Sequence, residues 1–207
     1  GRRLSHRQRQ LICDAAALLF HRLPTPGLRR WEHNFELALG RKPTTGERRS
    51  LVAAWLRNNL MALSVAGWSD HEILTRAFIS DKHLRRLADS LQGPGLVLAL
   101  PHMGSWDFAG AWAVRAGLAV VSAAERAGGC FHEQLMRARQ DMGITIRDMA
   151  DPDLMSTLSL DINQGSLVCL LADKDRLGTG IEVPWPTDDH PAVARVSTKP
   201  AMLAART

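Results

Sequence analysis

Tyrosine is absent from the sequence, aromatic residues make up only 5% of its 207 positions, and long apolar runs are missing as well. A membrane-spanning helix needs a run of roughly 18 apolar residues. The longest candidate, Leu11 to Leu19, is interrupted by Asp14. We therefore expect no transmembrane helix. Because Gly1 to Arg7 contain neither an apolar segment nor a small-residue cleavage site, we also expect no secretory signal there.

Cysteines are few and widely spaced, and the motifs of several enzyme classes are missing. Cys13, Cys130 and Cys169 form no Cys-x-x-Cys pair, which indicates reduced thiols. No His-Glu-x-x-His motif or Cys/His cluster is present, so we expect no metal site. A Gly-x-Ser-x-Gly elbow, a Walker loop and a Gly-x-Gly-x-x-Gly turn are also missing, which disfavours α/β-hydrolases and nucleotide-binding folds.

The charge balance is basic, with a formal net charge of +5. Such a balance suits anionic partners, which include nucleic acids, acidic membrane surfaces and phosphorylated substrates. The basic residues alternate with apolar ones instead of forming a solvated tail, and none of the common nucleic-acid motifs is present. We therefore expect no nucleic-acid partner.

The chain divides by pattern into a helical N-terminal region, residues 1–68, and an α/β core, residues 69–207. In the first part we expect helices over residues 7–20, 28–39 and 48–65, the last preceded by Thr44 and Glu47 at the spacing of a capping box. In the second part short apolar runs alternate with amphipathic stretches. We expect strands over residues 75–79, 96–100, 118–123, 144–146 and 166–171, and helices over residues 81–91, 106–114, 131–142 and 154–162.

This alternation predicts an α/β fold with a mostly parallel sheet flanked by helices, on which the helical N-terminal region packs. Ala201 to Thr207 resemble a helix that stops in mid-course. We therefore expect the chain to be a fragment, or to lack a C-terminal part of the core.

A histidine and a carboxylate lie five positions apart directly after one predicted core strand. His102 follows the apolar run Leu96 to Leu100, and Asp107 falls in the first turn of the next predicted helix. We expect Asp107 to hold one ring nitrogen of His102 and to leave the other as a general base. Open α/β sheets bind ligands at the carboxyl ends of their strands, where this pair is expected.

Two other predicted strands end in charged residues that would gather at the same edge of the sheet. One delivers Glu125 and Arg126, and the other delivers Asp173, Lys174 and Asp175. Each element also has a purely structural interpretation. His102 would cap a sheet edge, Asp107 would favour the helix dipole, Glu125 and Arg126 would form an exposed pair, and Asp173 and Asp175 would form turns.

Three ordered blocks carry a family resemblance: residues 95–107 around His102, residues 121–126 with 131–143, and residues 165–175 with 179–183. They resemble the bacterial lipid A biosynthesis acyltransferases, and within that family the actinobacterial phosphatidylinositol mannoside acyltransferases. The resemblance covers about half of the chain. The segment 184–200 departs from the family pattern, and Lys174 stands where the family more often has arginine, which binds phosphate in a bidentate fashion.

The resemblance implies transfer of a fatty acyl group from acyl-CoA, a substrate rather than a cofactor, to a sugar hydroxyl of an anionic membrane glycolipid. It implies His102 as the catalytic base and Asp107 as the carboxylate that orients it. It also implies peripheral association with the cytoplasmic face of the plasma membrane. The substrate-binding candidates are Ser105, Trp106, Glu125, Arg126, Asp173, Lys174 and Asp175. Two alternatives stay open: a non-catalytic lipid-binding protein on the same scaffold, and a thioester hydrolase.

Overall fold

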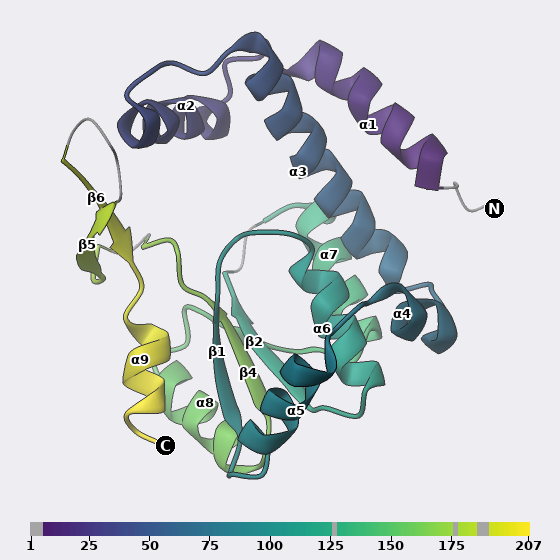
Figure 1. Cartoon of the computed structure of the whole chain (residues 1–207), viewed down its shortest axis with the longest axis vertical. Coiled ribbons are helices and arrows are strands. Elements are labelled where there is room, and N and C mark those ends of the chain that lie inside the picture. Colours follow the sequence, from purple (N-terminus) through teal and green to yellow (C-terminus); the bar gives the residue numbers. More distant parts are fainter. Residues whose placement is uncertain (1–5, 126–127, 176–177, 186–190) are drawn as a thin grey trace. The chain divides into compact units, whose positions relative to one another are not determined.

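The computed structural model describes residues 6–125, 128–175, 178–185 and 191–207. It is an α/β protein with a four-stranded parallel sheet flanked by helices and an N-terminal helical region, which confirms the predicted fold class (Figure 1). The chain forms two compact units. The first comprises residues 1–60 and 182–195, and the second comprises residues 61–181 and 196–207.

The first unit consists of helices and a hairpin. Its helices are α1 (His6–Phe20), α2 (Pro26–Leu39) and most of α3 (Thr45–Val65), and the hairpin pairs β5 (Ile181–Trp185) with β6 (Ala192–Val196). The start of α2 follows from its sequence, because the Thr25 hydroxyl accepts a hydrogen bond from the Leu28 N–H and Pro26 occupies the first turn. Gly40 ends α2 with a φ of 66°, a conformation that favours glycine.

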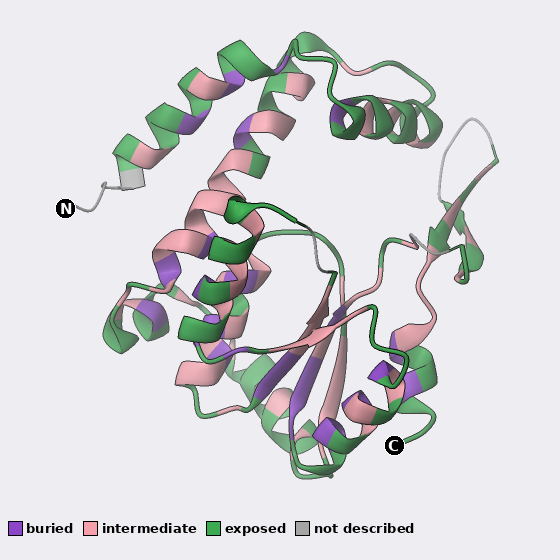
Figure 2. Ribbon diagram, turned by 180° about the vertical axis from the view of Figure 1, so that it is seen from behind, coloured by how far each residue is buried: buried purple, intermediate pink, exposed green. Residues whose placement is uncertain are grey.

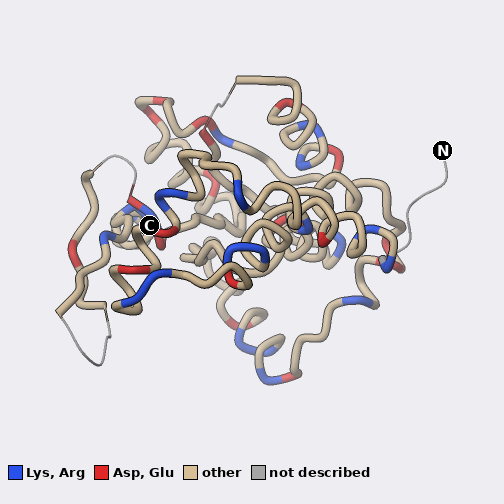
Figure 3. The backbone as a smooth tube through the Cα atoms, turned by 90° about the horizontal axis from the view of Figure 1, so that it is seen from above, with Lys and Arg blue, Asp and Glu red and all other residues tan. Residues whose placement is uncertain are grey.

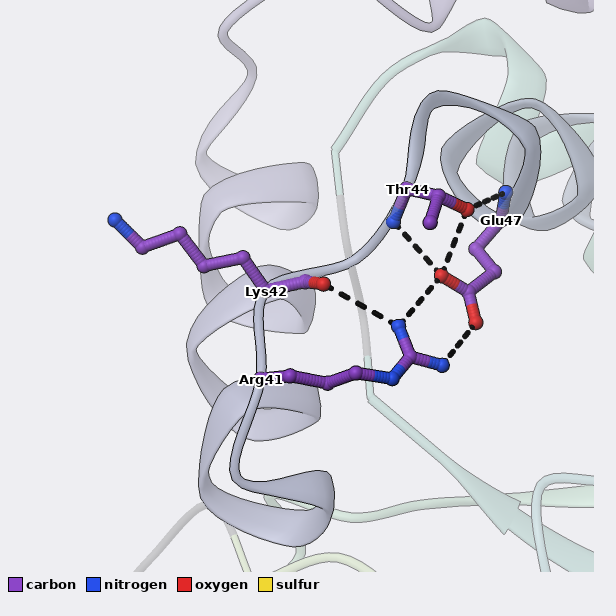
Figure 4. Close-up of polar contacts among 4 residues, drawn as sticks. All are labelled: Arg41, Lys42, Thr44 and Glu47. Atoms are coloured by element: carbon purple, nitrogen blue, oxygen red, sulfur yellow. Dashed lines mark hydrogen bonds and ion pairs between the residues drawn. The ribbon is translucent and has the colours of Figure 1, made fainter.

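The start of α3 is a reciprocal capping box that an arginine reinforces (Figure 4). The Thr44 N–H donates to the Glu47 carboxylate at 2.7 Å, and the Glu47 N–H donates back to the Thr44 hydroxyl at 3.2 Å. Arg41 donates to both Glu47 carboxylate oxygens, at 3.0 and 2.7 Å. The capping box predicted from the Thr44–Glu47 spacing is therefore confirmed, and the bidentate arginine was not anticipated.

These contacts predict an unusually acidic Glu47. The hydrogen bonds from Arg41 and Thr44 lower the pKa of Glu47 from 4.5 to about 2. Because the folded-state pKa is depressed, the stabilisation is present above pH 4.5 and is lost as the pH falls toward 2. An NMR titration of the Glu47 carboxyl carbon should show this midpoint in the wild type and a midpoint closer to 4.5 in Arg41→Gln. Arg137→Gln serves as the control, and a wild-type midpoint near 4.5 would refute the capping geometry.

The second unit is built around a parallel sheet of strand order β1-β4-β2-β3. Its strands are β1 (Leu96–Leu100), β2 (Val120–Ala124), β3 (Thr145–Asp148) and β4 (Leu167–Leu171). Its helices are α4 (Asp70–Arg76), α5 (Asp81–Ser90), α6 (Trp106–Arg115), α7 (Cys130–Asp141), α8 (Leu154–Asn163) and α9 (Lys199–Ala204). The β1–β4 register pairs Leu96 with Leu167 and Leu100 with Leu171.

The central strands β4 and β2 of this sheet have buried residues on both faces, as is typical of a parallel sheet (Figure 2). The buried apolar side chains form two hydrophobic clusters, and adjacent residues of one strand belong to different clusters. Val120 of β2 and Leu167 of β4 lie in the first cluster, and Val121 and Val168 lie in the second. The first cluster draws on α4, α6 and the residues around Met142, and the second on α8 and α9. The sheet therefore holds the carboxyl ends of β1, β4 and β2 in a fixed order.

The strand predicted over residues 75–79 is wrong, because α4 occupies Asp70–Arg76 and extended chain follows it. The reason lies upstream. The Ser69 N–H donates to the Glu72 carboxylate at 2.9 Å and the Glu72 N–H donates back to the Ser69 hydroxyl at 3.3 Å. Because this capping box stabilises the start of a helix, the short apolar stretch that follows it does not begin a strand. The β5–β6 hairpin was also not anticipated.

Three further expectations can be compared with the structure. Cys13, Cys130 and Cys169 are free thiols, as expected, and burial raises the pKa of Cys169 to about 11. Among the helices that the structure describes, none is long and apolar enough to cross a bilayer. In the described part of the chain, lysine and arginine residues are spread along the backbone among uncharged and acidic ones, in agreement with the alternation seen in the sequence (Figure 3).

Candidate active site

His102 and Asp173 meet at the carboxyl ends of two neighbouring strands. Each residue lies two positions beyond its strand, and the parallel register places Leu100 beside Leu171. A further ladder bond, from the Ala172 N–H to the Leu100 carbonyl at 2.9 Å, extends this register. The sheet therefore brings together two side chains that are 71 residues apart in the sequence.

The Asp173 carboxylate binds His102 with both oxygens. One oxygen lies 2.6 Å from the ring Nδ1, and the other accepts the His102 backbone N–H at 2.8 Å. Burial alone would raise the pKa of Asp173, but the hydrogen bonds from the His102 ring and backbone outweigh it and hold that pKa below its usual value. An ionised carboxylate at this position stabilises the tautomer with the proton on Nδ1.

This tautomer leaves Nε2 of His102 with a lone pair. Among the residues that the structure describes, none donates or accepts a hydrogen bond at Nε2. The His102 side chain is 37% exposed, so part of the ring is accessible to a substrate. This is the geometry that an oriented general base requires.

The loop after His102 leads directly into the amino end of α6. Gly104 has a φ of 64°, and the Ser105 hydroxyl caps the helix by accepting the Phe108 N–H at 3.4 Å. Trp106 then places its ring against His102, with ring centroids 5.6 Å apart and planes at 77°. The first N–H groups of a helix have no partner within it and favour negative charge. Such groups therefore lie within a few residues of His102 in the sequence.

Among the described residues, Asp107 forms no hydrogen bond with His102, contrary to the interaction expected from the sequence. Its carboxylate is buried, and it accepts hydrogen bonds from Arg139 of α7 at 2.6 and 3.5 Å. The reason is geometric, because Asp107 is already inside α6 and its side chain is directed toward α7. Asp173 makes the contact with the imidazole that the sequence assigned to Asp107.

The remaining candidates are distributed around this edge of the sheet. Glu125 is exposed one residue beyond β2, the other neighbour of β4, and Arg126 lies outside the described residues. Lys174 is exposed, and Asp175 accepts the Gly180 N–H at 2.9 Å, which is the turn-forming role left open above. In the described part of the chain no group of three or more potential ligands is placed to hold a metal ion.

Two contacts escaped the sequence reasoning. Arg139 was not identified, because nothing in the local pattern links it to Asp107. The His102–Asp173 pair had a usable signal, since the apolar runs Leu96–Leu100 and Leu167–Leu171 have the same length and the candidate side chain lies two positions after the end of each run.

Comparison with known proteins shows the family of the chain. Phosphatidylinositol mannoside acyltransferase of Mycobacterium tuberculosis strain H37Rv is 32% identical over 118 residues, which are 56% of this chain and 36% of that protein. The protein of the same name in Mycolicibacterium smegmatis is 29% identical over 118 residues, 56% of this chain and 38% of its own length. The matched segment thus spans little more than a third of these relatives. The model of the bacterial lipid A biosynthesis acyltransferases matches residues 2–207. The chain therefore belongs to the bacterial lipid A biosynthesis acyltransferase family.

Proposed function

We propose that the protein transfers a fatty acyl group from acyl-CoA to a sugar hydroxyl of a membrane glycolipid such as a phosphatidylinositol mannoside. The observation that carries this proposal is the bidentate contact of the Asp173 carboxylate with His102, in a chain of an acyltransferase family. The substrate class follows the name of the mycobacterial relatives. The proposal includes no cofactor.

His102 acts as the general base in this proposal. Its Nε2 removes the proton from the acceptor hydroxyl, and the hydroxyl oxygen attacks the thioester carbonyl. The new C–O bond forms as the carbonyl becomes a tetrahedral oxyanion. When this intermediate collapses, the C–S bond breaks and the imidazolium returns its proton to the leaving thiolate. Asp173 orients the ring throughout and stabilises its positive charge, because its carboxylate faces Nδ1 at 2.6 Å.

In this proposal the amino end of α6 stabilises the oxyanion. Ser105 fixes the first turn of this helix by accepting the Phe108 N–H, so the preceding N–H groups are held in a fixed direction. Preorganised donors of this kind are typically worth factors of about 10²–10³ in rate. Trp106, which contacts the His102 ring edge-to-face, limits the rotation of the base and borders the space beside it.

The other candidates bind the substrates in this proposal. Lys174, Glu125 and Arg126 contact the polar groups of the acyl-CoA and the glycolipid, while Asp175 holds the turn that follows β4. The acceptor is anionic and membrane-bound, so the enzyme works as a peripheral protein. Since acyl-CoA is a cytoplasmic donor, we place the reaction at the cytoplasmic face of the membrane.

Replacing the base tests the proposal. With a long-chain acyl-CoA and a phosphatidylinositol mannoside, we expect His102→Ala to lower kcat by about 10²–10⁴-fold. His71→Ala, which alters an exposed histidine of α4, is the matched control and should retain wild-type turnover. Undiminished turnover in His102→Ala would refute the base assignment. Thiol release that is equally fast without acceptor would indicate a hydrolase, and no thiol release at all would indicate a lipid-binding protein.

A further inference from the structure

The β5–β6 hairpin begins and ends beside the turn that carries Asp173. Its first strand starts directly after Gly180, whose N–H donates to the Asp175 carboxylate at 2.9 Å. Its second strand is followed directly by Ser197, whose N–H donates to the Ala172 carbonyl at 2.8 Å. Both contacts reach residues within two positions of Asp173 in the sequence. The hairpin is therefore rooted at the candidate active site.

The two roots of the hairpin also touch each other. A Cβ added at Gly180 would lie 2.1 Å from the Val196 carbonyl oxygen and 3.0 Å from the carboxyl carbon of Asp175. No side chain fits into this space, so glycine is the residue that allows the two strands to leave the site side by side.

The hairpin has one continuous apolar face. Glu182 of β5 and Arg195 of β6 form an ion pair at 3.2 Å, so these two side chains share a face. Successive side chains of a strand point to opposite faces, so the other face carries the alternate residues. These residues, which we call the hairpin apolar face, are Ile181, Val183, Trp185, Ala192, Ala194 and Val196. Ile181 is 55% exposed and Trp185 is 46% exposed, and the other four are half-buried.

The size of the hairpin apolar face indicates what it can bind. Three alternate residues of a strand span four rises of about 3.3 Å, so the face is about 13 Å long and two strands wide. A specific protein–protein interface needs on the order of 800 Å² from each partner, which is several times the area of this strip. A single linear hydrocarbon chain has the shape that such a strip can cover.

The backbone and the charges of the hairpin favour the same ligand. Pro184 lies in the middle of β5 and has no N–H to donate. Proline in a sheet is confined to positions whose nitrogen faces away from the partner strand, so the outer edge of β5 lacks a donor at its centre. This disfavours the addition of a strand from a second copy of the chain. Since the hairpin apolar face carries no charge, an uncharged apolar ligand is complementary to it.

We propose that the hairpin apolar face binds the fatty acyl chain of the thioester donor, with Ile181 and Trp185 as its main contacts. This inference rests on the proposed function, because it assigns the place of the chain whose carbonyl reacts at His102. Ile181 follows the root at Gly180, so the carbonyl end of the acyl chain lies at the root and the rest follows the strands. An isolated two-stranded hairpin is only marginally stable in water, and the bound chain covers its apolar face.

The dependence of transfer on chain length tests the hairpin apolar face. With the full chain and a phosphatidylinositol mannoside, Ile181→Ser/Trp185→Ser should raise the KM for hexadecanoyl-CoA by about 30-fold. The KM for butanoyl-CoA should match that of the wild type, because a short chain does not extend along the strands. The matched control, Val193→Ser, alters a residue on the opposite face of the hairpin that is 66% exposed, and it should change neither KM.

Three results of this assay would overturn the proposal. One is an equal KM for hexadecanoyl-CoA in the double variant and the wild type. Another is an equal rise in KM for both donors, since the hairpin would then act on the CoA group or on the fold. The third is a dimer in size-exclusion chromatography that the double variant abolishes while both KM values stay unchanged, which would assign the face to a second copy.

Fluorescence quenching supplies a second measurement, which decides the question even if the double variant fails to fold. Hexadecanoyl-CoA brominated in mid-chain quenches indole rings that contact the chain. Trp185→Phe keeps an apolar side chain, so without acceptor it should still bind this donor but lose part of the decrease in emission seen in the wild type. The matched control, Trp55→Phe, removes a tryptophan that is 59% exposed and should keep the full decrease. An identical decrease in Trp185→Phe and the wild type would contradict the acyl site.

The two measurements together separate this proposal from the proposed function. If the wild type transfers no acyl group but the brominated donor quenches Trp185, the acyl site stands and the proposed activity falls. If transfer is normal while the KM for hexadecanoyl-CoA and the quenching are both independent of Trp185, the activity stands and the acyl site falls.

Discussion

Asp173→Asn should lower kcat for acyl transfer by about 10²–10⁴-fold while it leaves the melting temperature within about 3 °C of the wild type. The large kinetic effect follows from two contacts of one carboxylate. One oxygen faces the His102 ring at 2.6 Å and the other accepts the His102 backbone N–H at 2.8 Å. Both oxygens act as acceptors, and an amide offers only one acceptor oxygen together with an NH₂ donor.

Either orientation of the introduced amide disrupts the base. If its nitrogen faces the ring, Nδ1 must accept and the proton moves to Nε2, where it blocks proton abstraction. If its oxygen faces the ring, the amide NH₂ opposes the His102 backbone N–H and displaces the loop. The stability effect stays small because the Asp173 side chain is 41% exposed, and water replaces the lost contact.

The matched control is Asp89→Asn, an exposed aspartate near the end of α5, which should change neither kcat nor the melting temperature. Circular dichroism and differential scanning fluorimetry check the folding of each variant, and single-turnover kinetics give the transfer step directly. A full rate in Asp173→Asn would remove Asp173 from the mechanism. A change in KM alone, with kcat unaltered, would make Asp173 a substrate-binding group instead of an orienting one.

The strands of the sheet were largely predictable from local pattern. The bounds of β1 agree with the predicted residues 96–100, and β4 begins one residue later than predicted. Buried parallel strands are short apolar runs with turn residues on both sides, and these runs have no competing helical period. The strand predicted at 75–79 failed because the capping box of Ser69 and Glu72 lies outside the window in which the apolar pattern was read.

The pairing within the site was less accessible, because it depends on strand order. His102 was found from its place after β1, but the nearest carboxylate in sequence, Asp107, was preferred to one 71 residues away. Asp173 comes within reach of His102 only because β1 and β4 are neighbours in the sheet. The sequence is also compatible with other parallel strand orders, in which these two strands would be separated. The inference that the strand ends converge at one edge of the sheet was correct. The identification of Asp173 as the partner of His102 required the register of β1 and β4.

The β5–β6 hairpin shows a different limit. Its strands, Ile181–Trp185 and Ala192–Val196, have prolines within or beside them and include exposed apolar residues such as Val193. Two-stranded ribbons of this kind alternate weakly, because they have no core face to define. The segment was noticed in the sequence only as a departure from the family pattern.

Asp107→Ala is expected to be the most destabilising single change in the site, at about 3–5 kcal/mol, or roughly 6–20 °C in melting temperature. The Asp107 side chain is 4% exposed, and its partner Arg139 is 17% exposed. Truncation therefore leaves an arginine charge in a poorly solvated position between α6 and α7. The matched control is Asp70→Ala, because Asp70 also pairs with an arginine, Arg115, at 2.7 Å but is 75% exposed. It should cost less than about 1 kcal/mol.

A double-mutant cycle separates the ion pair from the rest of the packing. If Asp107 and Arg139 stabilise the fold through each other, Arg139→Met should be destabilising alone, and Asp107→Ala/Arg139→Met should lose less than the sum of the two single variants by about 2 kcal/mol. Urea unfolding measures each free energy, and turnover is compared at a temperature where every variant is folded. A roughly thousandfold slower turnover with an unchanged free energy of unfolding would return Asp107 to the orienting role predicted from the sequence. A stability loss with turnover within about tenfold of the wild type would instead make Asp107 the residue that holds α6, and with it the helix amino end beside His102, against α7.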